Sequence, residues 1–477
     1  MRGGGGGIIP LPGAPGRDSD GLLREGGEAV RAELRAAQAH SPREIIEYQE
    51  GEPDEDATAL RFTQAFAGQL LFDHDDGAWY EWDGTRFKRD CRNRAFHYAR
   101  RLGRTQVKGK RSLCKVSVAA GAERFARADP RHAVDSSVWD ANQMALGTPV
   151  GTVELQSGEL RAADPADRIT KQTSVAPEEG EPTMWLRFLH EALNGDAGAI
   201  RFLQQWFGYC LTGDTREHAL AFIYGAGGNG KSVFLNTVAT ILGDYAVTAA
   251  MEAFTASKSS QHSTELAMLR GARLVTASET EEGRAWAESR IKQMTGGDPI
   301  TARFMRQDFF TYRPQFKLTI AGNHAPSLAN VDDAMRRRFN IVPFETKPAR
   351  PDRLLEEKLR AEHGRILAWG ISGCLDWQRS GLIRAETILA ATSGYFEDQD
   401  VFGQWINDRC ETGSGRWELP ARLFGDWSKF AHAAGDLPGS QRSLSDRLKK
   451  RGFVQAKTNG LRVYRGLNLR AAEASAE

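Results

Sequence analysis

Short, almost continuously apolar runs recur through the middle of the chain and predict buried β-strands. Four of them occur, at residues 219–224, within 271–279, and at 316–322 and 340–344. The first run is followed by a segment of helical length at 232–242, which Gly243 ends. Strands and helices in this arrangement predict an α/β domain with a parallel sheet over residues 212–385.

The segment before this domain, residues 57–211, predicts an α+β domain. Residues 79–82 (WYEW) alternate, turn at Asp83-Gly84 and return through residues 86–88, which is typical of a hairpin. A second hairpin is expected at 151–160. Apolar positions at helical spacing predict helices near residues 57–72, 90–103, 183–194 and 197–211.

The segment after it, residues 390–470, predicts a winged-helix-like domain. Three helices and a hairpin are expected, near residues 398–410, 419–433 and 440–451 and over 453–469. Residues 440–470 hold nine basic side chains and one acid. A helix that carries Arg442, Arg447 and Lys450 beside a basic hairpin is a candidate surface for duplex DNA. A basic surface that docks another protein is the alternative.

The first 56 residues predict a disordered lead, because a glycine run, three early prolines and an acidic stretch leave little apolar surface to bury.

The 477 residues have room for about three domains. The net charge of +1 is neutral on the question of a nucleic-acid partner, so only local clusters of charge are informative. Five dispersed cysteines without a C-x-x-C pair indicate neither a disulfide framework nor a zinc site. With no long apolar run for a membrane span or signal peptide, a cytoplasmic protein is expected.

One motif carries specific chemistry. Residues 225–232 (GAGGNGKS) fit the phosphate-binding pattern G-x-x-x-x-G-K-[ST], and they stand between a predicted strand and a predicted helix. Glycines let successive backbone N–H groups point at a phosphate, and the helix N-terminus adds the positive end of its dipole. We therefore expect Lys231 to contact the β- and γ-phosphates of ATP and Ser232 to contact Mg²⁺. The loop residues expected to bind the nucleotide with them are Gly225, Gly227, Gly228, Asn229 and Gly230.

Polar side chains follow the later strands. Glu279 ends the second apolar run and is a candidate to hold Mg²⁺ or to activate the attacking water, with an ordinary surface or capping glutamate as the alternative. Asn323 ends the third run and could contact the γ-phosphate, although a turn residue is common there. Three arginines within residues 332–339 (DDAMRRRF) precede the fourth run, and arginine suits the charge on a transferring phosphoryl group. Their alternative is an exposed basic helix end.

Two other stretches bear on partners. Residues 91–121 hold nine Lys and Arg and no Asp or Glu, which is typical either of a phosphate-contacting surface or of a solvated face. Residues 296–310 (GGDPITARFMRQDFF) predict two β-rich arms with a polar tip at 306–308.

The order of these motifs resembles the superfamily 3 helicases. GAGGNGKS, LVTASETEEG, GGDPITARF, LTIAGNH and DDAMRRRFNIVPF occur in that order, and the tryptophan hairpin and residues 207–215 (FGYCLTGDT) resemble the domain that precedes the helicase. The most similar members are the helicase portions of phage, plasmid and poxvirus-type primase-helicases. The resemblance covers residues 57–470.

The resemblance implies an AAA+-like ATPase core that assembles as a ring, a homo-hexamer, around DNA with ATP between subunits. Lys231 and Ser232 match the first motif of the family, Glu279 the acid of the second and Asn323 the sensor asparagine of the third. Arg337 and Arg338 match the arginine pair, one of which would act on the ATP of a neighbouring subunit, with Arg337 slightly favoured. The hairpin resembles the one that enters the central channel, so Arg306 and Arg303 would contact DNA. The family generally moves 3′ to 5′.

Two departures from the family limit what is carried over. Many ATPases have Asp-Glu where this chain has Ser278-Glu279, so holding the metal and activating water both fall on Glu279 unless Glu281 or Glu282 helps. Primase-helicases also carry a primase module upstream, which residues 1–56 are too short to hold. No primase activity is therefore expected from this chain, and a separate primase is a candidate partner.

The function expected from the sequence is ATP-dependent unwinding of DNA during replication of a phage, plasmid or mobile element in a bacterial host. Two alternatives remain. One is an initiator that binds an origin and uses ATP as an assembly switch. The other is an AAA+ ATPase that remodels a protein.

Overall fold

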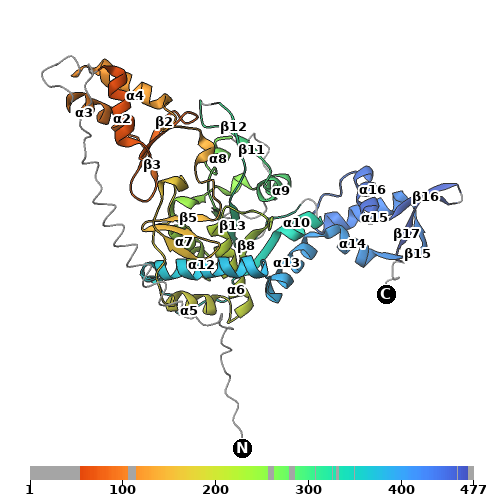
Figure 1. Ribbon diagram of the computed structural model, residues 1–477. Coiled ribbons are helices and arrows are strands. Elements are labelled where there is room, and N and C mark those ends of the chain that lie inside the picture. Colours follow the sequence, from red (N-terminus) through yellow and green to blue (C-terminus); the bar gives the residue numbers. More distant parts are fainter. Residues whose placement is uncertain are drawn as a thin grey trace, which may run out of the picture.

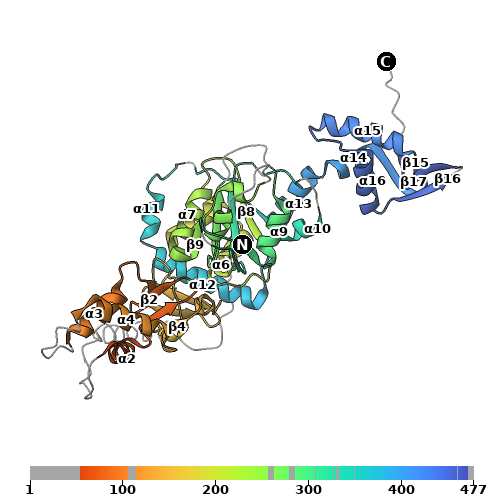
Figure 2. The same cartoon turned by 90° about the horizontal axis from the view of Figure 1, so that it is seen from above.

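The computed structural model describes residues 54–105, 114–255, 263–278, 285–306, 308–324, 326–328, 332–348, 350–458 and 460–470. Two smaller units flank a central α/β domain, and Figures 1 and 2 show them at opposite ends of it. One unit comprises residues 54–139 and the other residues 400–470. The predicted disordered lead lies almost wholly outside the described residues. Its last two positions, Glu55 and Asp56, belong to the first described helix.

The N-terminal unit packs three helices against a four-stranded sheet with the order β3-β2-β1-β4. Its apolar core contains Phe62, Phe72 and Trp79. The predicted tryptophan hairpin is confirmed, with Trp82 opposite Phe87. The elements are α2 (Glu55–Phe66), β1 (Leu70–Asp73), β2 (Ala78–Trp82), β3 (Phe87–Arg89), α3 (Arg94–Thr105), α4 (Val116–Ala128), β4 (Ala133–Val134) and a short 3₁₀ turn, η2 (Ser136–Val138).

The helix predicted over 57–72 was partly wrong. It ends at Phe66, and Gly68 follows with a φ of +78°, a conformation that interrupts a helix and suits glycine. The next residues form β1, which pairs with β2 from Leu70 opposite Glu81 onward. Leu70 and Leu71 fit either helical or strand spacing, so only the glycine and the pairing partner decide between them.

Residues 145–211 contribute to the core of the central domain. The antiparallel strands β5-β6-β7 confirm the second predicted hairpin, and the predicted helices near 183–194 and 197–211 are present. Leu146 and Val153 of this segment share one apolar cluster with Ile223 and Val238 of the central domain. The boundary predicted at residue 211 therefore falls inside a continuous core. The elements are β5 (Ala145–Thr148), β6 (Gly151–Glu154), β7 (Glu159–Arg161), η3 (Pro165–Asp167), α5 (Thr183–Ala192) and α6 (Ala197–Leu211).

The central sheet is parallel, as predicted, with the order β14-β8-β13-β10-β9. Its strands have apolar side chains on both faces: in β8, Ile223 packs in one core cluster and Phe222 in the other. This is why the strands are continuous apolar runs instead of alternating ones. The strands are β8 (Leu220–Tyr224), β9 (Ala246–Thr248), β10 (Leu274–Ser278), β13 (Lys317–Gly322) and β14 (Phe339–Pro343).

Helices cover both faces of this sheet. The cluster around Ile223 includes α6, α7 and α12, whereas the cluster around Phe222 includes α9, α10 and α13. None of the described helices combines the length and the apolar character that crossing a bilayer requires. The remaining elements are α7 (Lys231–Leu242), η4 (Gly243–Tyr245), η5 (Met251–Ala253), α8 (Ser263–Ala267), α9 (Glu288–Gly296), β11 (Ile300–Ala302), β12 (Phe310–Tyr312), α10 (Asp333–Arg338), α11 (Leu355–Arg360), α12 (His363–Ser380) and α13 (Glu386–Gln399).

Helices α6 and α12 approach each other closely through glycines. A Cβ added at Gly208 would overlap the backbone nitrogen of Cys374, and one added at Gly373 would overlap the carbonyl oxygen of Gln204. Backbone atoms cannot move aside as the end of a flexible side chain can. This contact holds α12 against the layer that also supports α7.

Gly208→Ala is therefore expected to destabilise the protein by about 3 kcal/mol or more, since the new methyl group would separate the two helices. The measurement is the midpoint of thermal unfolding. Gly394→Ala in α13 is the matched control, because an added Cβ there has no neighbour within 4 Å. It should stabilise the protein by about 0.4–1 kcal/mol through higher helix propensity. Equal midpoints for the two variants would contradict the close helix contact.

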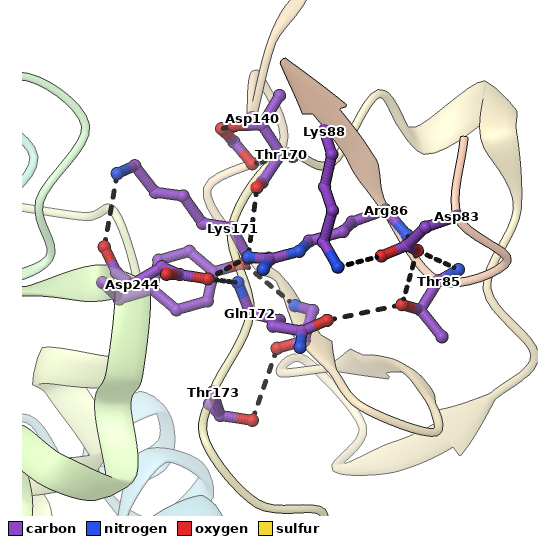
Figure 3. A network of polar contacts seen from close by, with 12 residues as sticks. Asp83, Thr85, Arg86, Lys88, Asp140, Thr170, Lys171, Gln172, Thr173 and Asp244 are labelled. Carbon is purple, nitrogen blue, oxygen red and sulfur yellow. Dashed lines mark hydrogen bonds and ion pairs between the residues drawn. The ribbon is translucent and has the colours of Figure 1, made fainter. Parts of the chain in front are cut away.

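A polar network joins the N-terminal unit to the far end of α7 (Figure 3). Arg86, after the turn between β2 and β3, forms an ion pair with Asp244 in η4. Asp244 also accepts a hydrogen bond of 3.2 Å from the backbone N–H of Gln172, and its carbonyl oxygen lies 3.2 Å from the ammonium nitrogen of Lys171. Thr85 donates to the side-chain oxygen of Gln172 at 3.3 Å. The helix that follows the phosphate-binding motif is thus tied at its C-terminal end to the N-terminal unit.

The C-terminal unit contains the three helices and the hairpin predicted for it, close to the expected residues. Its core contains Trp405 and Trp427. The sequence did not predict β15, which pairs with β17 and gives a three-stranded sheet with the order β15-β17-β16. The elements are α14 (Val401–Arg409), β15 (Cys410–Glu418), α15 (Pro420–Ala433), α16 (Gln441–Lys450), β16 (Val454–Thr458) and β17 (Leu461–Leu469).

Candidate nucleotide-binding site

The glycine loop follows the carboxyl end of β8 and leads directly into α7. Gly225 lies against the residue that follows β14, because a Cβ added there would overlap the carbonyl oxygen of Phe344. Gly230 has a φ of +90°, and a Cβ there would lie 2.6 Å from the Phe188 ring. Gly227 and Gly228 have open space where a Cβ would be, within 4 Å. The first and last glycines therefore permit the packing of the loop, while the middle two leave its outer side open to a ligand.

Two side chains of the motif hold the loop in shape. Asn229 donates a hydrogen bond to the carbonyl oxygen of Phe344 and accepts one of 2.9 Å from the ammonium group of Lys231. The same ammonium nitrogen lies 2.6 Å from the carbonyl oxygen of Gly225 and 3.0 Å from that of Ala226. Burial lowers the pKa of Lys231, and the positive charge of Lys347 lowers it further. An anion bound in the loop would offset both effects.

The N-terminus of α7 is available to an anion. Gly230 precedes this helix of 12 residues, and no side chain caps it. Its first N–H groups therefore point to the loop with the positive end of the helix dipole. Ser232 is exposed in the first turn, and its hydroxyl makes no hydrogen bond to the described residues. Lys231, Ser232 and the open glycines together fit a nucleoside triphosphate with Mg²⁺.

The strand order determines which predicted residues lie nearest the loop. β13, not β10, is the neighbour of β8, with Gly322 opposite Tyr224. Asn323 follows Gly322, is exposed, and is therefore level with the start of the loop. β10 lies one strand farther away and ends with the exposed Ser278. Glu279 itself lies outside the described residues, as do Glu281 and Glu282, so its predicted role stays a prediction.

The three successive arginines of α10 have different surroundings. The guanidinium of Arg336 lies over the Phe396 ring, 5.3 Å from its centre. Arg338 is half-buried and donates to the Thr295 hydroxyl at 3.1 Å. Arg337 is exposed, and among the described residues its guanidinium hydrogen-bonds only to the carbonyl oxygen of Asp333, one turn earlier in its own helix. Among the three, Arg337 is thus the arginine that can turn outward.

The arginines and the glycine loop lie at opposite ends of the strands. The arginines precede the start of β14, and the loop follows the end of β8. α10 leads into the start of β14, where Phe339 is opposite Leu220, whereas the loop begins after Tyr224, which is opposite Pro343. Five residues of strand separate the two levels by about 17 Å. Arg337 and Arg338 are therefore far from the phosphate site of their own chain.

The predicted hairpin is present as β11 and β12, with Ala302 opposite Phe310. Arg303 and Arg306 are both exposed at its end. Arg303 stacks over the Phe309 ring at 4.7 Å, and Arg306 has a φ of +62°, which is uncommon for a residue with a side chain. Met305 is 77% exposed. The tip thus presents two cations and apolar side chains to the surroundings.

The candidate DNA-contacting residues of α16 do not share one face. Arg442 and Lys450 are exposed. The guanidinium of Arg447 lies over the rings of Trp427 and Phe402, at 5.5 and 5.8 Å from their centres, so this side chain helps to cover the core of its own unit. The sequence grouped the three by proximity, whereas the helix turns Arg447 toward the tryptophan.

Two family models match the chain. One is described as "D5 N terminal like" and matches residues 59–194, and the other as "Family of unknown function (DUF5906)" and matches residues 223–338. The second match contains the glycine loop, the hairpin, Asn323 and the arginines of α10.

Curated relatives come from viruses. "Putative helicase L207/L206" of Acanthamoeba polyphaga mimivirus is 25% identical over 294 residues, which are 56% of this chain and 31% of the relative. "Putative helicase 022R" of Frog virus 3 (isolate Goorha) is 26% identical over 235 residues, 45% of this chain and 24% of the relative. The chain spans less than a third of the length of these proteins. The A-form apo structure of the NrS-1 C-terminal region shares the fold, with a TM-score of 0.50 at 12% identity over 87% of this chain and 99% of that one.

The family matches, the viral relatives named as putative helicases and the shared fold support the resemblance to the superfamily 3 primase-helicases. The residues from Gly225 to Arg338 that were predicted from motifs fall within one family match. The unit of residues 400–470 lies outside both matches, so any role for Arg442 or Lys450 depends on that unit alone.

The sequence did not indicate two contributors to the site. The carbonyl oxygen of Phe344 accepts from Asn229, and the charge of Lys347 acts on Lys231. Both residues follow β14, and the parallel pairing of β14 with β8 brings them beside the loop. The run of apolar residues at 340–344 predicted the strand but not its position next to β8.

Proposed function

We propose that the chain is an ATP-dependent DNA helicase that works as a ring-shaped oligomer, a homo-hexamer, in the replication of viral, plasmid or mobile-element DNA. The observation that carries the proposal is the placement of the glycine loop and Arg337 at opposite ends of the strands of one parallel sheet. Neither end alone makes a complete phosphoryl-transfer site. The loop of one copy and Arg337 of a neighbouring copy would make one together. The names of the viral relatives support DNA unwinding as the work coupled to hydrolysis.

In this proposal the residues of one subunit bind the nucleotide and those of the next act on it. The loop N–H groups and Lys231 hold the phosphates, and Ser232 with Glu279 holds Mg²⁺, which neutralises charge on the phosphate oxygens. Asn323 orients the attacking water or the γ-phosphate. Arg337 of the neighbouring copy stabilises the charge that develops on the transferring group.

The hairpin tip contacts single-stranded DNA in the channel. Arg303 and Arg306 bind phosphates, and movement of the tip with the nucleotide state pulls the strand. The decisive measurement is ATP hydrolysis by the purified chain with and without single-stranded DNA, combined with unwinding of a forked duplex. Hydrolysis that DNA does not stimulate, together with absence of unwinding, would refute the helicase.

Arg306→Ala is expected to keep DNA-independent hydrolysis and to lose DNA stimulation and unwinding, because the tip is remote in sequence and pairing from the glycine loop. Arg313→Ala is the matched control, since Arg313 is also exposed but lies beyond β12, away from the tip. It should unwind as the wild type does. Normal unwinding by Arg306→Ala would show that the tip does not grip DNA.

An origin-binding initiator that uses ATP as an assembly switch is the second candidate. The exposed Arg442 and Lys450 on α16, beside a β-hairpin, favour it. It requires tight binding of one duplex sequence without processive unwinding. A selection of bound duplexes from random DNA would separate the two: a recovered consensus without unwinding supports the initiator.

A further inference from the structure

Helix α3 of the N-terminal unit is anchored by small residues and presents cations to the outside. Ala95, Ala99 and Gly103 are buried against the other helices of the unit. All of its exposed positions except Thr105 are basic and recur at helical spacing, at Arg94, His97, Arg100, Arg101 and Arg104. The helix contains no acid, and Figure 1 shows it at the outer end of the molecule. One whole face of α3 is therefore cationic.

Arg94 and arginines of neighbouring elements have acidic partners among the described residues, unlike the three arginines in the second half of the helix. Arg94 pairs with Glu81 at 3.1 Å, Arg89 with Asp76 at 2.7 Å and Arg127 with the buried Glu123 at 2.8 Å. Within the described residues, Arg100, Arg101 and Arg104 have no ion pair. The run of residues 91–121 that surrounds them in sequence contains no acid either. No carboxylate of the described residues therefore compensates their charge.

This arrangement costs the isolated protein stability. Like charges three or four residues apart on a helix repel by about 0.2–0.5 kcal/mol per pair, and Arg104 stands at these distances from both Arg100 and Arg101. The helix dipole favours cations in the last turn, which offsets part of the repulsion at Arg101 and Arg104. A row of guanidinium groups on a convex helix suits an extended polyanion, since a single small anion would remain exposed on such a surface.

We propose that this arginine face, formed by Arg100, Arg101 and Arg104, binds the phosphate backbone of nucleic acid outside the central domain. The inference rests on the proposed function, which supplies DNA as the substrate. The contact would be independent of sequence, because guanidinium–phosphate contacts carry no base information. It would hold DNA at the end of the molecule opposite to the C-terminal unit (Figures 1 and 2).

The test compares two triple variants of the full chain with the same change in charge. Arg100→Gln/Arg101→Gln/Arg104→Gln removes the face, whereas Arg131→Gln/Arg201→Gln/Arg216→Gln removes three exposed arginines that pair with carboxylates elsewhere. Binding of fluorescent oligo-dT and of a duplex is measured by anisotropy between 50 and 200 mM salt. Three lost phosphate contacts should reduce the slope of log K against log salt by about 2 for the single strand and about 2.7 for the duplex. If the electrostatic contribution vanishes near 1 M salt, oligo-dT binding at 0.1 M should weaken about 100-fold.

The outcomes separate the inference from the proposed function. A wild-type chain without salt-dependent DNA binding would refute the helicase and the arginine face together. Normal wild-type binding with an unchanged slope in the α3 variant would refute the arginine face alone, as would equal losses in both variants. Loss of slope for the single strand only, or for the duplex only, identifies which form the face binds. The unfolding midpoint of the α3 variant should equal or exceed that of the wild type, because repulsion is relieved, so weak binding cannot be attributed to misfolding.

Discussion

Lys231→Ala is expected to reduce ATP hydrolysis by on the order of 10²- to 10³-fold or more, as removal of a single charge-stabilising donor does in other enzymes. The ammonium group is the cation held inside the glycine loop, where it lies 2.6 Å from the carbonyl oxygen of Gly225. Burial and the positive charge of Lys347 lower its pKa, and a phosphate bound in the loop would oppose that shift. Steady-state phosphate release at saturating ATP is the measurement.

A lysine elsewhere provides the control for Lys231. Lys358 in α11 is exposed and pairs with Asp352 at 2.6 Å, so Lys358→Ala changes the net charge equally without touching the loop. Its turnover should match the wild type. Because Lys231 also caps loop carbonyl groups, unfolding midpoints must be compared as well. Wild-type turnover by a folded Lys231→Ala variant would mean that the loop does not serve hydrolysis.

Arg337→Ala is expected to reduce turnover by about 10³- to 10⁵-fold while nucleotide binding is retained, if the arginine acts as it does in other phosphoryl-transfer enzymes. Arg337 is exposed and lies at the end of the strands opposite to the end that carries its own loop. The decisive experiment co-expresses Arg337→Ala with Lys231→Ala. Each variant is inactive alone, but a Lys231-intact subunit beside an Arg337-intact one forms a complete site. Random mixing should restore about one quarter of the sites in a head-to-tail ring.

Two outcomes would contradict the shared site. No recovery in the mixture would show that Arg337 serves its own chain and not that of a neighbour. Full activity of Arg337→Ala would move the role to Arg338, whose guanidinium would first have to leave the Thr295 hydroxyl. Arg336→Ala is the control within the same helix, since that guanidinium lies over Phe396 and should affect stability more than turnover.

The sequence predicted the strands of the central sheet well because both of their faces are buried. Residues such as Phe222 and Ile223 need not alternate with polar ones, so each strand is an apolar run of the right length. Ambiguity arose where an apolar segment was short. Leu70 to Asp73 fit a helix until the pairing with β2 was known, and β15 was not predicted because glycines and polar residues fill its middle.

The candidate site was predictable only where local sequence determines geometry. The motif around Lys231 specifies a loop and a helix start within eight residues, and those are present. The order of strands depends on long-range packing, which no local pattern encodes. For this reason the sequence did not show that Asn323, at the end of β13, lies nearer to the loop strand than the end of β10 does. The contact between Arg447 and Trp427 also depends on packing between distant segments. The separation of Arg337 from its own loop also became visible only through the register of β14.

The ion pair between Arg86 and Asp244 allows α7 to transmit movement from the glycine loop to the N-terminal unit. This helix of 12 residues is about 18 Å long, with the glycine loop at one end and the N-terminal unit fastened at the other. A stiff rod transmits a displacement along its axis, whereas a flexible connection would absorb it. Strain produced where phosphate binds would therefore arrive at the β2–β3 turn as a push or a pull. The N-terminal unit would then act as an arm driven by the rod.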